Sequence, residues 1–134
     1  MASIAAIRAI DHRDATKLRK ARVRTTEALL QQAGTRTQRS NLSERTGIPT
    51  SELLHWAHQA DLMRINGIGS EYADLLGSAG VDTVKALRRR NAANLMTMMT
   101  QVNTKRRTVQ RLPTIEMVQG WVDAAVALDS TVVS

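Results

Sequence analysis

An internal repeat restricts how this chain can fold more than any other feature of its sequence. Two stretches of the 134 residues match without a gap at an offset of 58 positions. The paired residues are Ile7/Ile65, Ile10/Ile68, Ala15/Ala73, Leu18/Leu76, Ala21/Ala79, Val23/Val81, Thr25/Thr83, Ala28/Ala86 and Leu29/Leu87. With a one-residue slip, Ile48-Pro49-Thr50 and Trp56 also correspond to Leu112-Pro113-Thr114 and Trp121. Most pairs are apolar, which is expected when one supersecondary unit is used twice.

The residues that carry the repeat predict an all-α protein. The apolar residues are mainly Leu, Val, Ile, Met and Ala, Phe is absent, and aromatic residues make up only 2%. Leu, Met and Ala favour helices, whereas strands favour β-branched and aromatic residues. We therefore expect two repeats, residues 1–60 and residues 61–134, packed as one compact helical domain. Residues 130–134 are expected to fray.

Helix-starting and helix-ending residues divide the second repeat. Asp61 is expected to cap a short helix through Ile65, and Asn66-Gly67-Ile68-Gly69 should interrupt it. Ser70 is expected to cap a helix to about residue 79, followed by Gly80 in the left-handed conformation. Asp82 or Thr83 then begins the next helix.

The repeats are expected to end in matching helices. Thr50 and Thr114 are predicted to cap the helices that carry Trp56 and Trp121. Residues 103–113 are expected to form a basic connector before the second of these helices. Both tryptophans should be buried.

The segment Leu62-x-x-Ile65-Asn66-Gly67-Ile68-Gly69-Ser70-Glu71-Tyr72-Ala73-Asp74-Leu75-Leu76 resembles a helix-hairpin-helix motif, and Gly80-Val81-Asp82-Thr83 resembles its continuation. Glycines permit a tight turn, and without side chains they let a partner approach the backbone. Amides at a helix N-terminus attract anions. The first repeat has Ala9-Ile10-Asp11 where the hairpin glycines would stand, so its hairpin is expected to bend differently.

The chain is similar to a bacterial family, the domain of unknown function 4332 family. The residues that carry the resemblance run from Thr46-Gly47-Ile48 through Leu53-Leu54-x-Trp56, the hairpin and Gly80-Val81-Asp82-Thr83-Val84. They continue through Arg90-Asn91, Asn94-Leu95, Asn103 and Pro113 to Trp121. The resemblance covers most of residues 23–125.

The resemblance to helix-hairpin-helix proteins implies that the amides of Gly67, Ile68, Gly69 and Ser70 contact phosphates without reading sequence. It also implies a monovalent cation held by the carbonyls of Met63, Ile65 and Ile68. A basic residue commonly follows such a hairpin where this chain has Glu71. Glu71 either helps to retain a cation or pairs with Arg64 and closes the site to anions, and we expect closure because the helix dipole favours a carboxylate there.

Charge alternates along the chain in blocks. The net charge is +7, and residues 85–111 contain eight basic residues and no acidic one. Those eight residues, Lys85, Arg88, Arg89, Arg90, Lys105, Arg106, Arg107 and Arg111, are the candidate nucleic-acid contacts. An acidic protein or a second copy of the chain is the alternative partner, because residues 48–84 are acidic and Arg-rich segments also bind acidic protein surfaces.

No arrangement typical of an enzyme is present. The sequence has no nucleophile–His–Asp set, no P-loop and no Cys, which excludes disulfides and thiolate metal sites. His55-x-x-His58 has metal-ligand spacing but no third ligand beside it. We expect a cytoplasmic, non-enzymatic binding module without a cofactor. The leading function is weak, sequence-independent binding of DNA or RNA, and the alternative is an adaptor between proteins.

Overall fold

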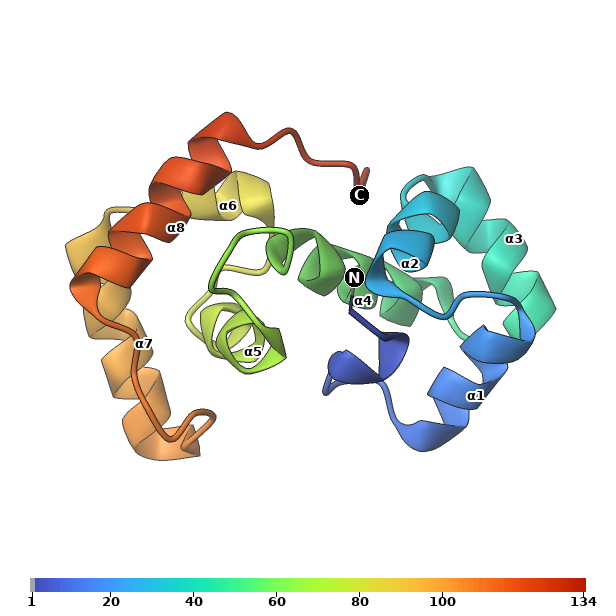
Figure 1. Ribbon diagram of the computed structural model, residues 1–134, viewed down its shortest axis with the longest axis horizontal. Coiled ribbons are helices and arrows are strands. Elements are labelled where there is room, and N and C mark those ends of the chain that lie inside the picture. The colour runs from blue at the N-terminus through green and yellow to red at the C-terminus, as the bar shows by residue number, and fades with distance from the viewer. Residues whose placement is uncertain (1) are drawn as a thin grey trace. The chain divides into compact units, whose positions relative to one another are not determined.

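A computed structural model describes residues 2–134, and within that range the protein is all-helical (Figure 1). The elements are η1 (Ile4–Ala6), α1 (His12–Lys20), α2 (Thr26–Ala33), α3 (Arg36–Thr46), α4 (Thr50–Leu62), α5 (Ser70–Ser78), α6 (Val84–Arg88), α7 (Ala92–Arg106) and α8 (Ile115–Ala127). The only β pairing among these residues is an isolated antiparallel bridge between Ser3 and Thr25. The chain forms two compact units. Unit 1 runs to Asp61 and also includes Thr131–Ser134, and unit 2 is Leu62–Ser130.

Unit 1 consists of η1, α1, α2, α3 and most of α4. Its helices begin at side-chain caps: Asp11 caps α1, Thr25 caps α2, and Thr35 forms a capping box with Gln38 at the start of α3. Each cap satisfies amides that have no partner inside the helix. Its largest fully buried side chains are Ile4, Ile7, Leu18, Leu29, Leu42, Ile48 and Leu53.

Unit 2 packs α5, α6, α7 and α8 around one apolar core. Thr83, Asn91 and Thr114 cap α6, α7 and α8 through their side-chain oxygens. The core joins the hairpin residues Ile65 and Ile68 to Leu75 and Leu76 of α5, Val84 and Leu87 of α6, Leu95 and Met99 of α7, and Val118, Trp121 and Val122 of α8. The hairpin is therefore part of this core and is not an independent loop.

Residues 58 positions apart make the same local hydrogen bonds in the two units. In each hairpin an isoleucine amide donates to the isoleucine carbonyl three residues earlier, at 3.1 Å in both: Ile10 to Ile7, and Ile68 to Ile65. After α1 the amide of Val23 donates to Leu18 at 2.8 Å, and after α5 the amide of Val81 donates to Leu76 at 2.8 Å. Thr25 and Thr83 are the N-caps of the next helices.

Burial follows the same pairing. Leu18 and Leu76 are both fully buried, and Trp56 and Trp121 are each 3% exposed. The prediction that these matched residues are buried is confirmed. The backbone of the two turns differs at Gly67, which has a φ of +91°, whereas Ala9 is not among the residues with positive φ. The first turn therefore bends differently at this residue, as expected, but both turns keep the hydrogen bond between their two isoleucines.

Three predicted helix starts are wrong by a short distance. Asp61 does not cap a helix: it lies fully buried inside α4, which continues to Leu62 because its buried face includes Ala60 and Leu62. Thr50 is the first residue of α4 and not the residue before it. Ser70 is likewise the first residue of α5, with Gly69 as its N-cap. The predictions for Gly80, Thr83 and Thr114 are confirmed.

Two predictions for the second repeat need correction. Residues 103–106 belong to α7, which ends at Arg106 with Arg107 in the left-handed conformation, so the connector is residues 107–114. The last residues do not fray. The amide of Val133 donates to the carbonyl of Gly34 at 2.8 Å, and Val132 is only 8% exposed. These residues are held by unit 1.

Candidate nucleic-acid interface

The ring of Trp121 lies close to the backbone of the hairpin turn in unit 2. Ile65 and Ile68 are buried in the core, while Gly67 and Gly69 between and beside them are exposed. A Cβ added to Gly67 would stand 3.1 Å from the indole Nε1 of Trp121. Positive φ and this close approach both favour glycine at residue 67.

The first turn of α5 begins without a side-chain cap. Its N-cap is Gly69, which has extended backbone (φ −90°, ψ −175°) and no side chain to accept from the helix amides. The equivalent N-cap in unit 1 is Asp11, whose Oδ1 accepts from the amide of Asp14 at 2.8 Å. A helix N-terminus that lacks a side-chain cap keeps the positive end of the helix dipole, which favours an anion. One hairpin therefore supplies its own carboxylate and the other does not.

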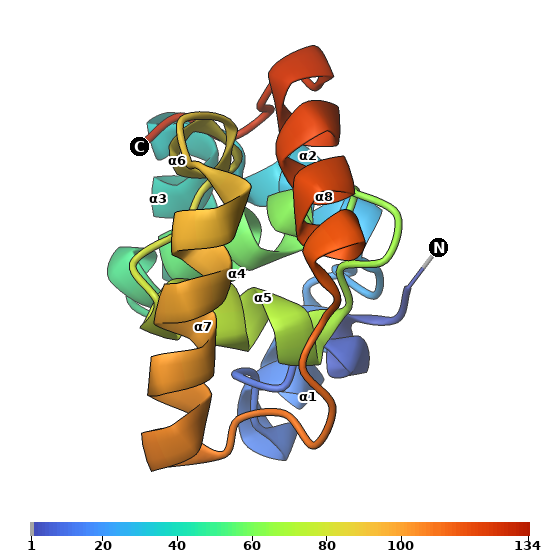
Figure 2. The same ribbon diagram turned by 90° about the vertical axis from the view of Figure 1, so that its left-hand side faces the viewer.

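Four of the predicted contact residues lie on one exposed segment, which we call the basic end: Lys105, Arg106, Arg107 and Arg111. The hydroxyl of Tyr72, in the first turn of α5, donates to the carbonyl of Arg111 at 3.1 Å. The Tyr72 and Trp121 rings are 5.3 Å apart. Tyr72 thus holds the connector beside the start of α5, which lies behind the connector in Figure 2.

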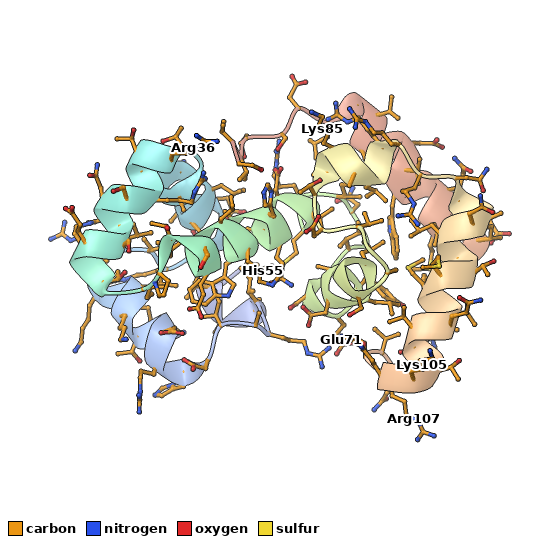
Figure 3. The ribbon with its side chains drawn as sticks, turned by 180° about the vertical axis from the view of Figure 1, so that it is seen from behind. Arg36, His55, Glu71, Lys85, Lys105 and Arg107 are labelled. Atoms are coloured by element: carbon orange, nitrogen blue, oxygen red, sulfur yellow. The ribbon has the colours of Figure 1, made fainter. Side chains whose placement is uncertain are left out.

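The other four predicted contact residues belong to a different part of unit 2. Lys85 and Arg89 are exposed on and after α6, and Lys85 lies at the opposite end of the unit from Lys105 and Arg107 (Figure 3). Arg88 is half-buried, and its Nη2 donates to the carbonyl of Leu128 at 2.8 Å, at the end of α8. The Nη1 of Arg90 lies 3.9 Å from the place of a Cβ on Gly80. The fold therefore separates the eight basic residues into two groups.

The predicted closure of the hairpin by an ion pair between Glu71 and Arg64 stays a prediction. The guanidinium of Arg64 donates to the carbonyl of Asp129 at 3.0 Å. Arg64 precedes the turn and is directed toward the end of α8, whereas Glu71 lies in the first turn of α5. In the hairpin the carbonyl of Ile65 accepts from Ile68, and the predicted cation at Met63, Ile65 and Ile68 stays a prediction.

Comparison with known families identifies the family of this chain. The model of a domain of unknown function (DUF4332) matches residues 8–128. The chain belongs to this family. No curated protein and no solved structure matches it.

The DUF4332 match includes α4 and α8, the helices that carry Trp56 and Trp121. A cleft lies beside each of these tryptophans. In unit 2 a cavity of about 420 Å³ lies between the hairpin and α8, lined by residues that include Arg64, Gly67, Glu116 and Trp121. In unit 1 a cavity of about 400 Å³ is lined by Ala9, Asp11, Asp14, Ser51, Glu52, His55 and Trp56. Ala9 and Trp56 are the repeat partners of Gly67 and Trp121. Sequence reasoning missed both clefts and the bridging role of Tyr72.

Neither a metal cluster nor a membrane-spanning helix is present in residues 2–134 of this DUF4332 protein. No group of three or more His, Cys, Asp and Glu side chains in that range can hold a metal ion. His58 contacts the hydroxyl of Ser134 through Nε2 at 3.1 Å. None of the helices described is long and apolar enough to cross a bilayer.

Proposed function

We propose that the two units are tandem helix-hairpin-helix modules, the first degenerate and the second intact, and that the protein is a non-enzymatic binder of nucleic acid. Unit 2 makes the contact. The amides of Gly67 and Gly69 and the first turn of α5 from Ser70 meet one phosphate, and the basic end follows the neighbouring backbone. The predicted contact through the amide of Ile68 is dropped, because that amide donates to the carbonyl of Ile65. The binding is weak and independent of nucleic-acid sequence. We propose that the protein acts in the cytoplasm.

One observation carries this proposal: the uncapped start of α5 lies beside the basic end, joined to it by the hydrogen bond from Tyr72 to Arg111. Amides at a helix N-terminus favour a phosphate oxygen, and flexible Lys and Arg side chains neutralise neighbouring phosphates. Neither feature contacts a base edge, so the contact positions the protein without specifying sequence.

Glu71 limits the strength of the interaction. It is exposed in the first turn of α5, close to where a phosphate would stand. A like charge there opposes the release of counterions that drives nonspecific binding. With four cations at the basic end, we expect the logarithm of affinity to fall with the logarithm of salt concentration, with a slope of at most about −3 to −4.

The test titrates duplex and single-stranded DNA at two salt concentrations, about 50 and 200 mM. The variant Lys105→Gln/Arg106→Gln should weaken binding to every sequence and flatten the salt dependence. The matched control Lys85→Gln/Arg89→Gln removes charge from the opposite end of unit 2 and should change binding much less. Binding that is absent at low salt, or equal losses in the two variants, would contradict the proposal.

The second candidate is a protein-interaction adaptor, and Glu71 is the observation that favours it. An exposed carboxylate in the first turn of α5 fits a basic protein partner as well as it opposes phosphate. In that case the basic end would bind an acidic protein surface or a second copy of the chain. Recovery of a stoichiometric protein partner after nuclease treatment, together with no DNA binding at low salt, would favour this function.

A further inference from the structure

Arg39 is a buried cation that binds three main-chain carbonyls in unit 1. Its side chain is only 3% exposed. Its Nη1 donates to the carbonyls of Ala33 at 2.9 Å and Gly34 at 3.0 Å, and its Nη2 donates to the carbonyl of Val133. Burial, with a smaller contribution from Arg36, lowers the pKa of the guanidinium. Burying a charged arginine costs free energy unless hydrogen bonds to protein groups replace those to water. The carbonyl of Val133 is the third such acceptor for Arg39, beside those of Ala33 and Gly34.

Gly34 binds the amide of Val133, the residue whose carbonyl Arg39 binds. Its carbonyl accepts the amide of Val133 at 2.8 Å, so both main-chain groups of that residue are bound. A Cβ at Gly34 would stand 2.7 Å from the carbonyl oxygen of Leu30 and 2.8 Å from that of Thr131. The φ of Gly34 is −71°, which any residue can adopt. Glycine is therefore suited to this position by the close approach of the Leu30 and Thr131 carbonyl oxygens, not by its conformation.

Only one side chain of the bound segment is buried, with exposed residues on both sides of it. Val132 is 8% exposed and Val133 is 58% exposed. The next residue is held as well, because the Nε of Arg36 donates to the carbonyl of Ser134 at 2.9 Å and His58 contacts its hydroxyl. One side chain is thus buried while the main chain of the two residues after it is hydrogen-bonded, and grooves recognise extended peptides by the same combination.

We propose that this surface of unit 1 is a binding groove for an extended peptide, and that Thr131–Ser134 is its intramolecular ligand. The groove selects a β-branched apolar side chain at the place of Val132 and binds the main chain of the next residue through Gly34 and Arg39. The connection through Leu128 to Ser130 keeps the ligand at a high effective concentration. A peptide added in trans therefore competes poorly until the tail is removed. This site is separate from the basic end and does not depend on the nucleic-acid proposal.

The test adds a synthetic peptide, Asp-Ser-Thr-Val-Val-Ser, to the chain ended at Ser130. The peptide should bind the shortened chain and not the intact one. Placing Asp at the Val132 position of the peptide should weaken binding about tenfold or more, because a buried valine contributes roughly 1.5 kcal/mol or more. Asp at the Val133 position is the matched control and should bind nearly as well, because that side chain is exposed. Equal binding of all three peptides, or no binding by a folded shortened chain, would overturn the proposal.

Hydrogen exchange on the intact chain decides the matter if the shortened chain does not fold. The Val133 amide should exchange at least tenfold more slowly than in the free peptide, and the substitution Val132→Asp in the chain should remove that protection. Val133→Asp should retain protection at residue 133. An amide at residue 133 that exchanges at the rate of the free peptide in the intact protein would show that the groove does not hold the tail.

Discussion

Asp11 and Gly69 are the N-cap residues at the same position of two related turns, but only Asp11 has a side chain that caps its helix. Its carboxylate accepts the amide of Asp14 at 2.8 Å, whereas Gly69 leaves the start of α5 without a side-chain cap. The first hairpin thereby holds an anion of its own, and the second has room for an external one. This difference explains why the proposed phosphate contact belongs to unit 2 although both hairpins share the isoleucine hydrogen bond.

Arg22 and Gly80 give a prediction about stability. They follow α1 and α5 at equivalent positions with φ values of +66° and +91°. In the folded protein, a non-glycine residue in this left-handed conformation is less favourable than glycine by about 1–2 kcal/mol. Glycine offsets about 0.5–1 kcal/mol of this difference, because it has more conformational freedom to lose from the unfolded chain. Arg22→Gly should therefore raise the free energy of unfolding by up to about 1 kcal/mol, and Gly80→Ala should lower it by a similar amount. Urea unfolding measures both. A loss of stability in Arg22→Gly would contradict the equivalence of the two turns.

Gly67→Val should destabilise the protein by about 1–3 kcal/mol, because valine at positive φ is strained and its Cβ would crowd Trp121. Gly77→Ala is the control. Gly77 lies within α5 and a Cβ there meets nothing within 4 Å, so alanine should stabilise the helix by up to about 1 kcal/mol. Thermal unfolding followed by circular dichroism checks the opposite signs. An unchanged melting temperature in Gly67→Val would show that the turn does not need glycine.

Leu18→Ala and Leu76→Ala should each cost about 2–5 kcal/mol, since both side chains are fully buried at paired positions of the repeat. The measurement is the free energy of unfolding of the unit that contains each residue. The exposed Val126, at 64% exposure, provides a control, and Val126→Ala should change stability by less than about 0.5 kcal/mol. A small effect at one leucine and a large effect at the other would show that the two cores are not built alike.

The sequence was sufficient for features that depend on nearby residues. Thr83 and Thr114 cap helices as predicted, and Gly80 adopts the predicted left-handed conformation, because each effect arises within one turn of chain. The buried tryptophans were predictable from the repeat. Asp61 was misplaced because an aspartate before apolar residues is also typical of an N-cap, and only the packing of α4 reveals that it is buried.

Long-range contacts were beyond the sequence. Arg39 lies in a polar segment and gives no apolar pattern, yet it binds Val133, 94 positions away. The grouping of the basic residues also depends on packing. Lys85 lies at the opposite end of unit 2 from Lys105 and Arg107, and Arg88 is directed toward the end of α8. Charge counted along the chain could not distinguish these residues.

The most direct test of the central claim is DNA binding by Gly69→Asp, measured beside its stability. Gly69 has extended backbone and open space around its Cβ position, so aspartate should fit and cap α5 as Asp11 caps α1. An aspartate cap stabilises a helix by a few tenths of a kcal/mol relative to glycine. We predict a protein at least as stable as the natural one that binds DNA several-fold more weakly at low salt, with Gly69→Asn, which caps without charge, between the two. A stable Gly69→Asp protein with unchanged DNA affinity would contradict the account.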